Sequence, residues 1–251
     1  MNVWVLAFLL FVATATGGCL GSPDPVRQVR VTDRYLMSSE ASTLEIVIRA
    51  TVGYEPAALT LDGLRDQALV ATGRADVQVV SGPAVQASPG GDNEWGSAEF
   101  AALWAELFPS QRAEVAVMVV GFVPGRIENL SHVGGIGTGS VAVVFQSEVD
   151  YFVPPPVSIE QPSDRRLYER AAAVHEVGHL LGLVNNHVPR LHGPLAKDRI
   201  HSGDPDSVMY PVLTGGTFLG LGVGEDTVDY RFTQDDIDDI RDFQRAWVTD
   251  S

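Results

Sequence analysis

The stretch HEVGHLLGLVNNH, residues 175–187, decides how the rest of this chain is interpreted. The segment before it, PSDRRLYERAAAV at 162–174, contains an alanine-rich run that favours a helix. On a helix, His175 and His179 lie one turn apart and project from the same face. Their two imidazoles can therefore reach one tetrahedral metal ion, and zinc is an ion that such nitrogen ligands suit.

Glu176 follows the first of these histidines and lies on the flank where a metal-held water would sit. A carboxylate there can take a proton from the water and pass it to a leaving amine. Zinc makes this feasible because it lowers the pKa of water toward neutrality. The pattern predicts one catalytic zinc ion with Glu176 as general base. The plainer alternative is a surface helix with two unrelated histidines.

The motif HEVGHLLG, together with SVMYP at 207–211, resembles the metzincin clan of zinc metalloproteases, and matrixins most closely. The resemblance implies that Met209 belongs to a methionine turn beneath the zinc site. It also implies that Gly182 lets the chain turn sharply after the helix. In matrixins the third zinc-binding histidine lies eight residues before this methionine, and that position is His201 here. The third ligand would then follow an insertion between Gly182 and His201.

Other residues remain alternatives for the third ligand. A standard metzincin spacing would place it at position 185, which is occupied by Asn185, a poor zinc ligand. His187 lies two positions further on and is the main alternative, with His192 in the insertion as another. His132, in NLSHVGGIG, is interpreted as a surface or edge-strand residue whose loop could flank a substrate cleft.

Alternating strand and helix patterns predict an α/β (α+β) fold in one domain. Alternating β-branched segments and a continuous apolar run predict strands, and helical spacing of apolar residues predicts helices between them. The expected architecture is a mixed twisted sheet with packed helices, an active-site helix, a Met-turn and a C-terminal helix. The expected strands are 43–53, 75–82, 113–125 and 139–149, and the expected helices before the zinc motif are 56–73 and 94–109.

The resemblance also implies roles for segments outside the zinc motif. In metzincins an antiparallel edge strand binds the substrate in extended form, and GSVAVVF at 139–145 is expected to be that strand. The segment FTQDDIDDIRDFQ at 232–244 is similar to the closing helix of matrixins, with Thr233 as its N-cap. Residues 213–230 lie where the family builds its specificity pocket, and their glycines leave the preference unreadable.

The N-terminus reads as a targeting segment. Residues 3–13 are almost wholly apolar, too short for a comfortable membrane span and typical of a signal peptide. Small residues then lead to Cys19, the only cysteine, in a pattern that resembles a lipoprotein signal. The expected organisation is a signal peptide at 1–18, a tether at 19–42 and a metzincin-like domain at 43–251. The predicted location is the cell surface, through a lipid on Cys19, or alternatively the secreted fraction.

The charge balance excludes one class of partner. The chain has 32 acidic residues against 17 basic ones, of which Lys197 is the only lysine, giving a net charge of −15. Such a surface repels nucleic acid, and it resembles proteins of high-salt organisms. The sequence indicates no oligomeric state.

The sequence therefore predicts a secreted or surface-anchored zinc-dependent endopeptidase that acts on protein or peptide substrates. The alternative is a zinc-binding surface lipoprotein that serves as a scaffold and cleaves nothing. Glu176 favours the enzyme, because a purely structural zinc site needs no base and usually closes with four protein ligands.

Overall fold

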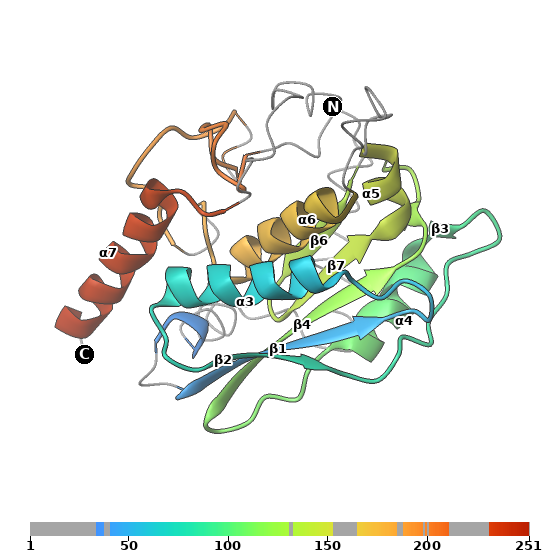
Figure 1. Ribbon diagram of the computed structural model, residues 1–251, viewed down its shortest axis with the longest axis horizontal. Coiled ribbons are helices and arrows are strands. Elements are labelled where there is room, and N and C mark those ends of the chain that lie inside the picture. The colour runs from blue at the N-terminus through green and yellow to red at the C-terminus, as the bar shows by residue number, and fades with distance from the viewer. Residues whose placement is uncertain are drawn as a thin grey trace.

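A five-stranded sheet with helices on both faces forms the body of the chain (Figure 1). The strand order is β2-β1-β4-β7-β6. The computed structural model describes residues 34–37, 41–130, 133–152, 165–184, 188–197, 199, 201–210 and 231–250. Residue 152 and residues 247–250 are described as backbone only.

The sheet is mostly parallel. β1 pairs in parallel with β2 on one side and with β4 on the other, and β4 pairs in parallel with β7. Only β6 runs antiparallel, and it pairs with β7 at the edge of the described sheet. The strands are β1 Thr43–Ala50, β2 Val77–Ser81, β4 Val115–Val123, β6 Gly135–Thr138 and β7 Val141–Phe145, with β3 Glu94–Trp95 and β5 Arg126–Ile127 forming a separate two-stranded pair.

The helices divide between the two faces of the sheet. α3 and α6 pack together on one face, α4 covers the other, and α7 lies beside the end of α3 (Figure 1). α5 follows directly from β7 and contacts α6. The helices are α3 Ala58–Thr72, α4 Ser97–Leu107, α5 Gln146–Phe152, α6 Arg165–Leu180 and α7 Gln234–Asp250.

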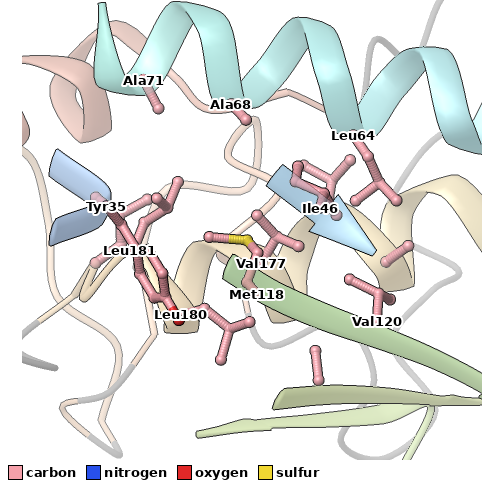
Figure 2. Close-up of a cluster of buried hydrophobic side chains, with 14 of the residues drawn as sticks. Tyr35, Ile46, Leu64, Ala68, Ala71, Met118, Val120, Val177, Leu180 and Leu181 are labelled. Carbon is pink, nitrogen blue, oxygen red and sulfur yellow. The ribbon is translucent and has the colours of Figure 1, made fainter. Parts of the chain in front are cut away.

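The two faces of the central strands have separate cores, because successive side chains of a strand point to opposite sides. In β4, Val120 and Phe122 join the core under α3 and α6, whereas Val119 and Val123 join the core under α4. Figure 2 shows the first core, where Leu64 and Ala68 of α3, Val177 and Leu180 of α6, and Ile46 and Met118 of the sheet meet. The buried face of α6 is therefore fixed against the sheet.

A buried carboxylate also fixes α6 relative to its neighbours. Glu169 of α6 accepts hydrogen bonds from the backbone N–H of Ala57 (2.8 Å) and the hydroxyl of Thr60 (2.6 Å), at the N-terminal end of α3. It also accepts from Gln146 Nε2 of α5, at 3.0 Å, and from Arg165 Nη1, at 3.0 Å. The position at the start of α3 is favourable for this carboxylate, because a negative charge is stabilised at the N-terminus of a helix. Through these hydrogen bonds Glu169 connects α6 with α3 and α5.

The predicted mixed α/β fold is confirmed, and β4 is the central strand that its continuous apolar run indicated. Two details were wrong. GSVAVVF is not the edge strand, because β7 is fully buried and pairs on both sides. The antiparallel edge strand is β6, in the glycine-rich segment before β7, which was not among the predicted strands. Residues from Gln146 onward form α5 instead of continuing β7.

Several predicted features lie outside the described residues. These include the apolar segment 3–13, Cys19 with most of the proposed tether at 19–42, and the loop at 213–230. Residues 34–37 and 41–42 of that tether are described, and Tyr35 and Leu36 are buried in the core. Within the described part of the chain, no helix is both long and apolar enough to cross a membrane.

Candidate metal centre

The first two histidines of the site lie side by side on α6. His175 and His179 occupy the last two turns of the helix, and their Nε2 atoms are 3.2 Å apart. The Ala-rich segment before them and the apolar residues Val174, Val177 and Leu180 bury one face of the helix. The helical spacing therefore delivers both imidazoles to one point, as the sequence indicated.

The chain turns sharply just after α6. Gly182 has φ 83°, in the left-handed region, and its N–H donates to His179 O (3.0 Å). The N–H of Leu183 donates to Gly178 O (3.0 Å), which completes a Schellman motif that ends the helix. A glycine suits this position because it has no Cβ to clash there. The turn carries the chain away from the histidine pair.

The insertion that follows returns the chain to the site as a tight loop. The N–H of Ala196 donates to His201 O, and the N–H of Gly203 donates to Pro194 O, each at 2.9 Å. His201 thereby lies against the helix pair, with its ring centroid 5.1 Å from that of His175 and 5.2 Å from that of His179. The ligand atoms of the three histidines all lie within 4.8 Å of one another.

The geometry suits a zinc ion. Two nitrogens at zinc distances of about 2.0–2.1 Å in a tetrahedral arrangement lie about 3.3 Å apart, close to the 3.2 Å of the helical pair. His175 Nδ1 lies 2.7 Å from Val208 O, so the N–H at Nδ1 donates to this carbonyl and Nε2 keeps its lone pair toward the site. The pKa of His179 is held well below its usual value by burial and by the neighbouring His175 and His201.

Met209 packs against α6 beneath His175 and His179, and this contact is called the methionine floor of the site. It is fully buried, and a Cβ atom placed on Gly178 would lie only 2.3 Å from Met209 Sδ. Gly178 stands between the two helical histidines, so the absence of a side chain there is what lets the methionine approach the helix. The N–H of Ser202 donates to Met209 O (2.8 Å), which ties this floor to the loop of the third histidine.

The carboxyl of Glu176 rests against the edge strand β6. A Cβ atom on Gly135 would lie 2.6 Å from Glu176 Cγ, and one on Gly137 would lie 2.6 Å from the Glu176 carbonyl oxygen. Burial raises the pKa of the Glu176 carboxyl to about 8. A metal ion bound by the histidines would oppose this shift, because positive charge favours the carboxylate. The side chain of Glu176 thus has a fixed place between α6 and β6.

The structure does not describe every residue that the sequence singled out. Asn185, His187 and His132 lie outside the described residues. His192 is described and points elsewhere, since its Nε2 lies 2.9 Å from Asp242 Oδ2 on α7. Of the described candidates, the structure therefore brings together His175, His179 and His201. Glu176 follows His175 on α6 and packs against β6, and Met209 packs against Gly178 of the same helix.

Sequence reasoning missed three glycines that shape the site. Gly135 and Gly137 stand two residues apart, which is the spacing of one face of a strand, and this regularity was the available signal. Gly178 lies within the helical motif, where a glycine is unfavourable by about 1 kcal/mol relative to alanine and so indicates a close neighbour.

Comparisons with known proteins give little further guidance. Neither the known protein families nor the curated proteins contain a match to this sequence. Among solved structures, the chain is similar to archaemetzincin from Methanopyrus kandleri, with 17% identity and a TM-score of 0.49. The match covers 81% of this chain and 97% of archaemetzincin. The resemblance to matrixins stays a prediction from the sequence motifs.

Proposed function

We propose that this chain is a zinc-dependent endopeptidase in which His175, His179 and His201 hold the metal ion. The observation that carries the proposal is the convergence of three imidazoles, from a helix and a distant loop, with ligand atoms within 4.8 Å. Catalytic zinc sites use three protein ligands and keep a fourth position open, whereas structural sites close with four. The donor set and the hydrogen bond from His175 to Val208 fit such an ion.

Glu176 is the residue that moves protons in this proposal. Bound zinc supplies Lewis acidity, which lowers the pKa of water and polarises a peptide carbonyl. The Glu176 carboxylate takes the proton of the attacking water and delivers it to the leaving amine. The close approach of Gly135 and Gly137 holds this carboxylate in place on the side of β6.

The edge strand β6 supports cleavage within a chain rather than at its end. β6 pairs with β7 on one side only in the described sheet, and it packs against Glu176. A peptide in extended form can add to such an edge by backbone hydrogen bonds, with residues bound on both sides of the bond that is cut. The substrate class we propose is therefore an extended segment of a protein or peptide.

The place of action follows from the N-terminal sequence. We propose that the enzyme works outside the cytoplasm, anchored by a lipid on Cys19 or, alternatively, secreted. The acidic, lysine-poor composition suits work in high salt.

The test is the Glu176→Gln variant, assayed on an unfolded protein substrate in low and high salt. Cleavage should fall by about 10²–10⁴-fold, because the amide cannot accept the proton, while the zinc content stays that of the wild type. Glu106→Gln is a matched control, because Glu106 pairs with Arg49 beside α4 on the opposite face of the sheet. Zinc binding without any cleavage that depends on Glu176 would overturn the proposal and favour the scaffold alternative.

A further inference from the structure

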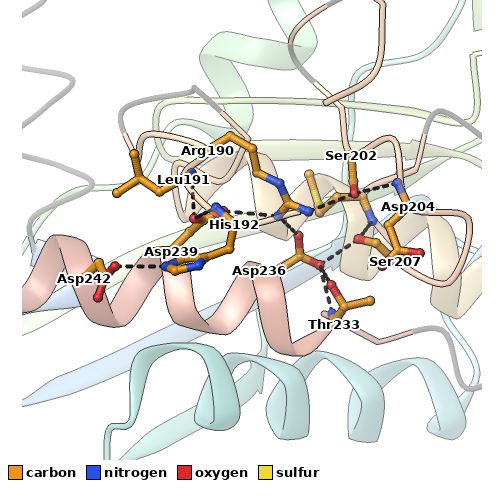
Figure 3. Close-up of polar contacts among 11 residues, drawn as sticks. Arg190, Leu191, His192, Ser202, Asp204, Ser207, Thr233, Asp236, Asp239 and Asp242 are labelled. Carbon is orange, nitrogen blue, oxygen red and sulfur yellow. Dashed lines mark hydrogen bonds and ion pairs between the residues drawn. The ribbon is translucent and has the colours of Figure 1, made fainter. Parts of the chain in front are cut away.

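A buried ion cluster joins the insertion to the C-terminal helix (Figure 3). Arg190 Nη1 lies 2.5 Å from Asp236 Oδ1 and 3.2 Å from Asp239 Oδ2, both on α7. The three side chains are 1%, 0% and 0% exposed. Removing charges from water is expensive, so such a cluster persists only where its geometry is closely fixed.

The cluster reaches the residue next to the third histidine. Arg190 Nη2 donates to Ser202 Oγ (3.1 Å), and Ser202, which is fully buried, directly follows His201. The same hydroxyl accepts from the backbone N–H of Asp204 (3.1 Å). Through the hydroxyl of Ser202, the Arg190 guanidinium therefore holds the chain at the residue that directly follows His201.

The other end of the cluster reaches the methionine floor. Ser207 Oγ donates to Asp236 Oδ2 (2.7 Å) and accepts from the N–H of Met209 (2.9 Å). Asp236 Oδ2 also accepts from the backbone N–H of Thr233 (2.8 Å), at the start of α7. One carboxylate thus connects α7 with the segment that carries both Met209 and Val208, the hydrogen-bond partner of His175.

We infer that Arg190 is a positioning residue for the metal site, acting with Asp236 of α7 through Ser202 and Ser207. The inference rests on the proposed zinc site. His201 comes from a long insertion, and no helical spacing holds it against His175 and His179. Closing and ordering such a loop costs conformational entropy. The buried guanidinium fixes the loop at the residue beside the ligand, so that the third imidazole meets the pair already set by α6.

The inference is tested by zinc affinity, measured by competition with a coloured chelator on the whole protein. Residues that orient metal ligands typically change metal affinity by about 10–100-fold when they are removed, and we expect a loss in this range for Arg190→Gln. Arg49→Gln is the matched control, because Arg49 forms an ion pair with Glu106 beside α4, on the opposite face of the sheet. It should lose stability and keep wild-type zinc affinity.

A second readout separates positioning from mere stability. In the Co²⁺-loaded protein the visible spectrum reports the geometry of the ligands, and Arg190→Gln should change its shape while Arg49→Gln leaves it unchanged. Ser202→Ala removes only the hydroxyl between Arg190 and the His201 loop, and it should shift affinity and spectrum in the same direction by a smaller amount. This variant decides the question if Arg190→Gln does not fold.

Two outcomes would overturn the inference, and they are distinguishable. If the wild type binds Zn²⁺ tightly and both Arg190→Gln and Ser202→Ala match it in affinity and spectrum, the cluster is only a structural clamp. If the wild type itself binds neither Zn²⁺ nor Co²⁺, the proposed metal site fails, and the inference fails with it.

Discussion

The helix α6 and the loop that carries His201 bring imidazoles to the same point by different means. On α6 the backbone alone sets the spacing, and the two Nε2 atoms lie 3.2 Å apart. In the loop, the position of His201 depends on contacts with residues far along the chain, including Arg190 with Asp236, 46 residues away. One half of the site is local, and the other half is tertiary.

This difference predicts different weaknesses. The helical half should survive any change that leaves α6 folded, because its geometry is built into the helix. The loop half should fail whenever α7 loses its hold on the segments around His201 and Met209, even if α6 remains intact. The metal site should therefore also be sensitive at residues that touch no ligand, such as Arg190 and Asp236.

The largest effect should come from the buried cluster. Asp236→Ala leaves Arg190 with less compensation and removes the acceptor of Ser207 and Thr233, and breaking a buried ion pair costs about 3–5 kcal/mol. Urea denaturation of the metal-free protein measures this loss. Asp239→Asn should cost less, because burial already raises the pKa of Asp239 and an amide oxygen can still accept from Leu191 and His192.

An exposed ion pair provides the contrast for this prediction. Asp62 of α3 pairs with Arg65 at 3.9 Å on the surface, where such pairs contribute little. If Asp62→Ala and Asp236→Ala reduce stability equally, α7 does not hold the loop through the buried cluster.

The next effect concerns the floor that both halves share. Met209→Ala removes a buried side chain and should cost about 2–5 kcal/mol by urea denaturation. Gly178→Ala should also destabilise the wild type, because the new Cβ would meet Met209 Sδ at 2.3 Å.

A double-mutant cycle sharpens this prediction. In the Met209→Ala background, Gly178→Ala should cost clearly less than in the wild type, because only Phe232 Cε1 then remains closer than 3.0 Å to the new Cβ, at 2.9 Å. Simple additivity of the two changes would contradict the contact between α6 and the Met209 segment.

A smaller effect on stability is expected where Glu176 of α6 packs against Gly135 of β6. Gly135→Ala places a methyl group where Glu176 Cγ lies, and overpacking of this kind costs about 1–3 kcal/mol. Cleavage should fall while zinc is retained, as measured by turnover and metal content. Gly91→Ala is the control, because a Cβ there meets nothing within 4 Å. Equal turnover in both variants would show that β6 does not position the carboxyl.

The smallest effect should come from His192 at the outer end of the cluster. The hydrogen bond with Asp242 raises the pKa of His192, and hydrogen bonds from His192 and Arg245 lower the pKa of Asp242. Because the pKa of His192 is raised in the folded protein, its charge adds stability below the ordinary histidine pKa. This stability is lost as the pH rises through the pKa of His192 in the folded protein. Because the pKa of Asp242 is lowered in the folded protein, its charge adds stability above the ordinary aspartate pKa. This stability is lost as the pH falls through the pKa of Asp242 in the folded protein.

The pair should therefore stabilise the protein most between about pH 4 and 6.5. His192→Gln should lower the melting temperature slightly near pH 5 and leave it unchanged near pH 9. An equal loss at both values would mean that the charge on His192 plays no part.

The local half of the site could be predicted from the sequence because thirteen residues contain its determinants. The spacing of His175 and His179 needs only a helix, and the alanine-rich run before the motif predicted one. The position of His201 was suggested only by its distance from Met209, through the resemblance of the two motifs to matrixins. Nothing in the sequence indicated that Arg190 is buried, because its partners lie on α7.

The edge strand shows why part of the fold was missed. Glycines normally weaken strands, and the segment around Gly135 and Gly137 was not among the predicted strands. Glycine is needed at these two positions because a larger side chain would displace Glu176. This requirement comes from the neighbouring helix, so the strand propensity of the segment does not reveal it.

The central claim is that a tertiary loop supplies the third zinc ligand, and X-ray absorption at the zinc edge tests it most directly. The wild type should show three imidazole ligands, from His175, His179 and His201. His201→Ala should reduce them to two and weaken zinc binding, while His187→Ala should leave the spectrum unchanged. Loss of an imidazole in His187→Ala, with His201→Ala matching the wild type, would contradict the account.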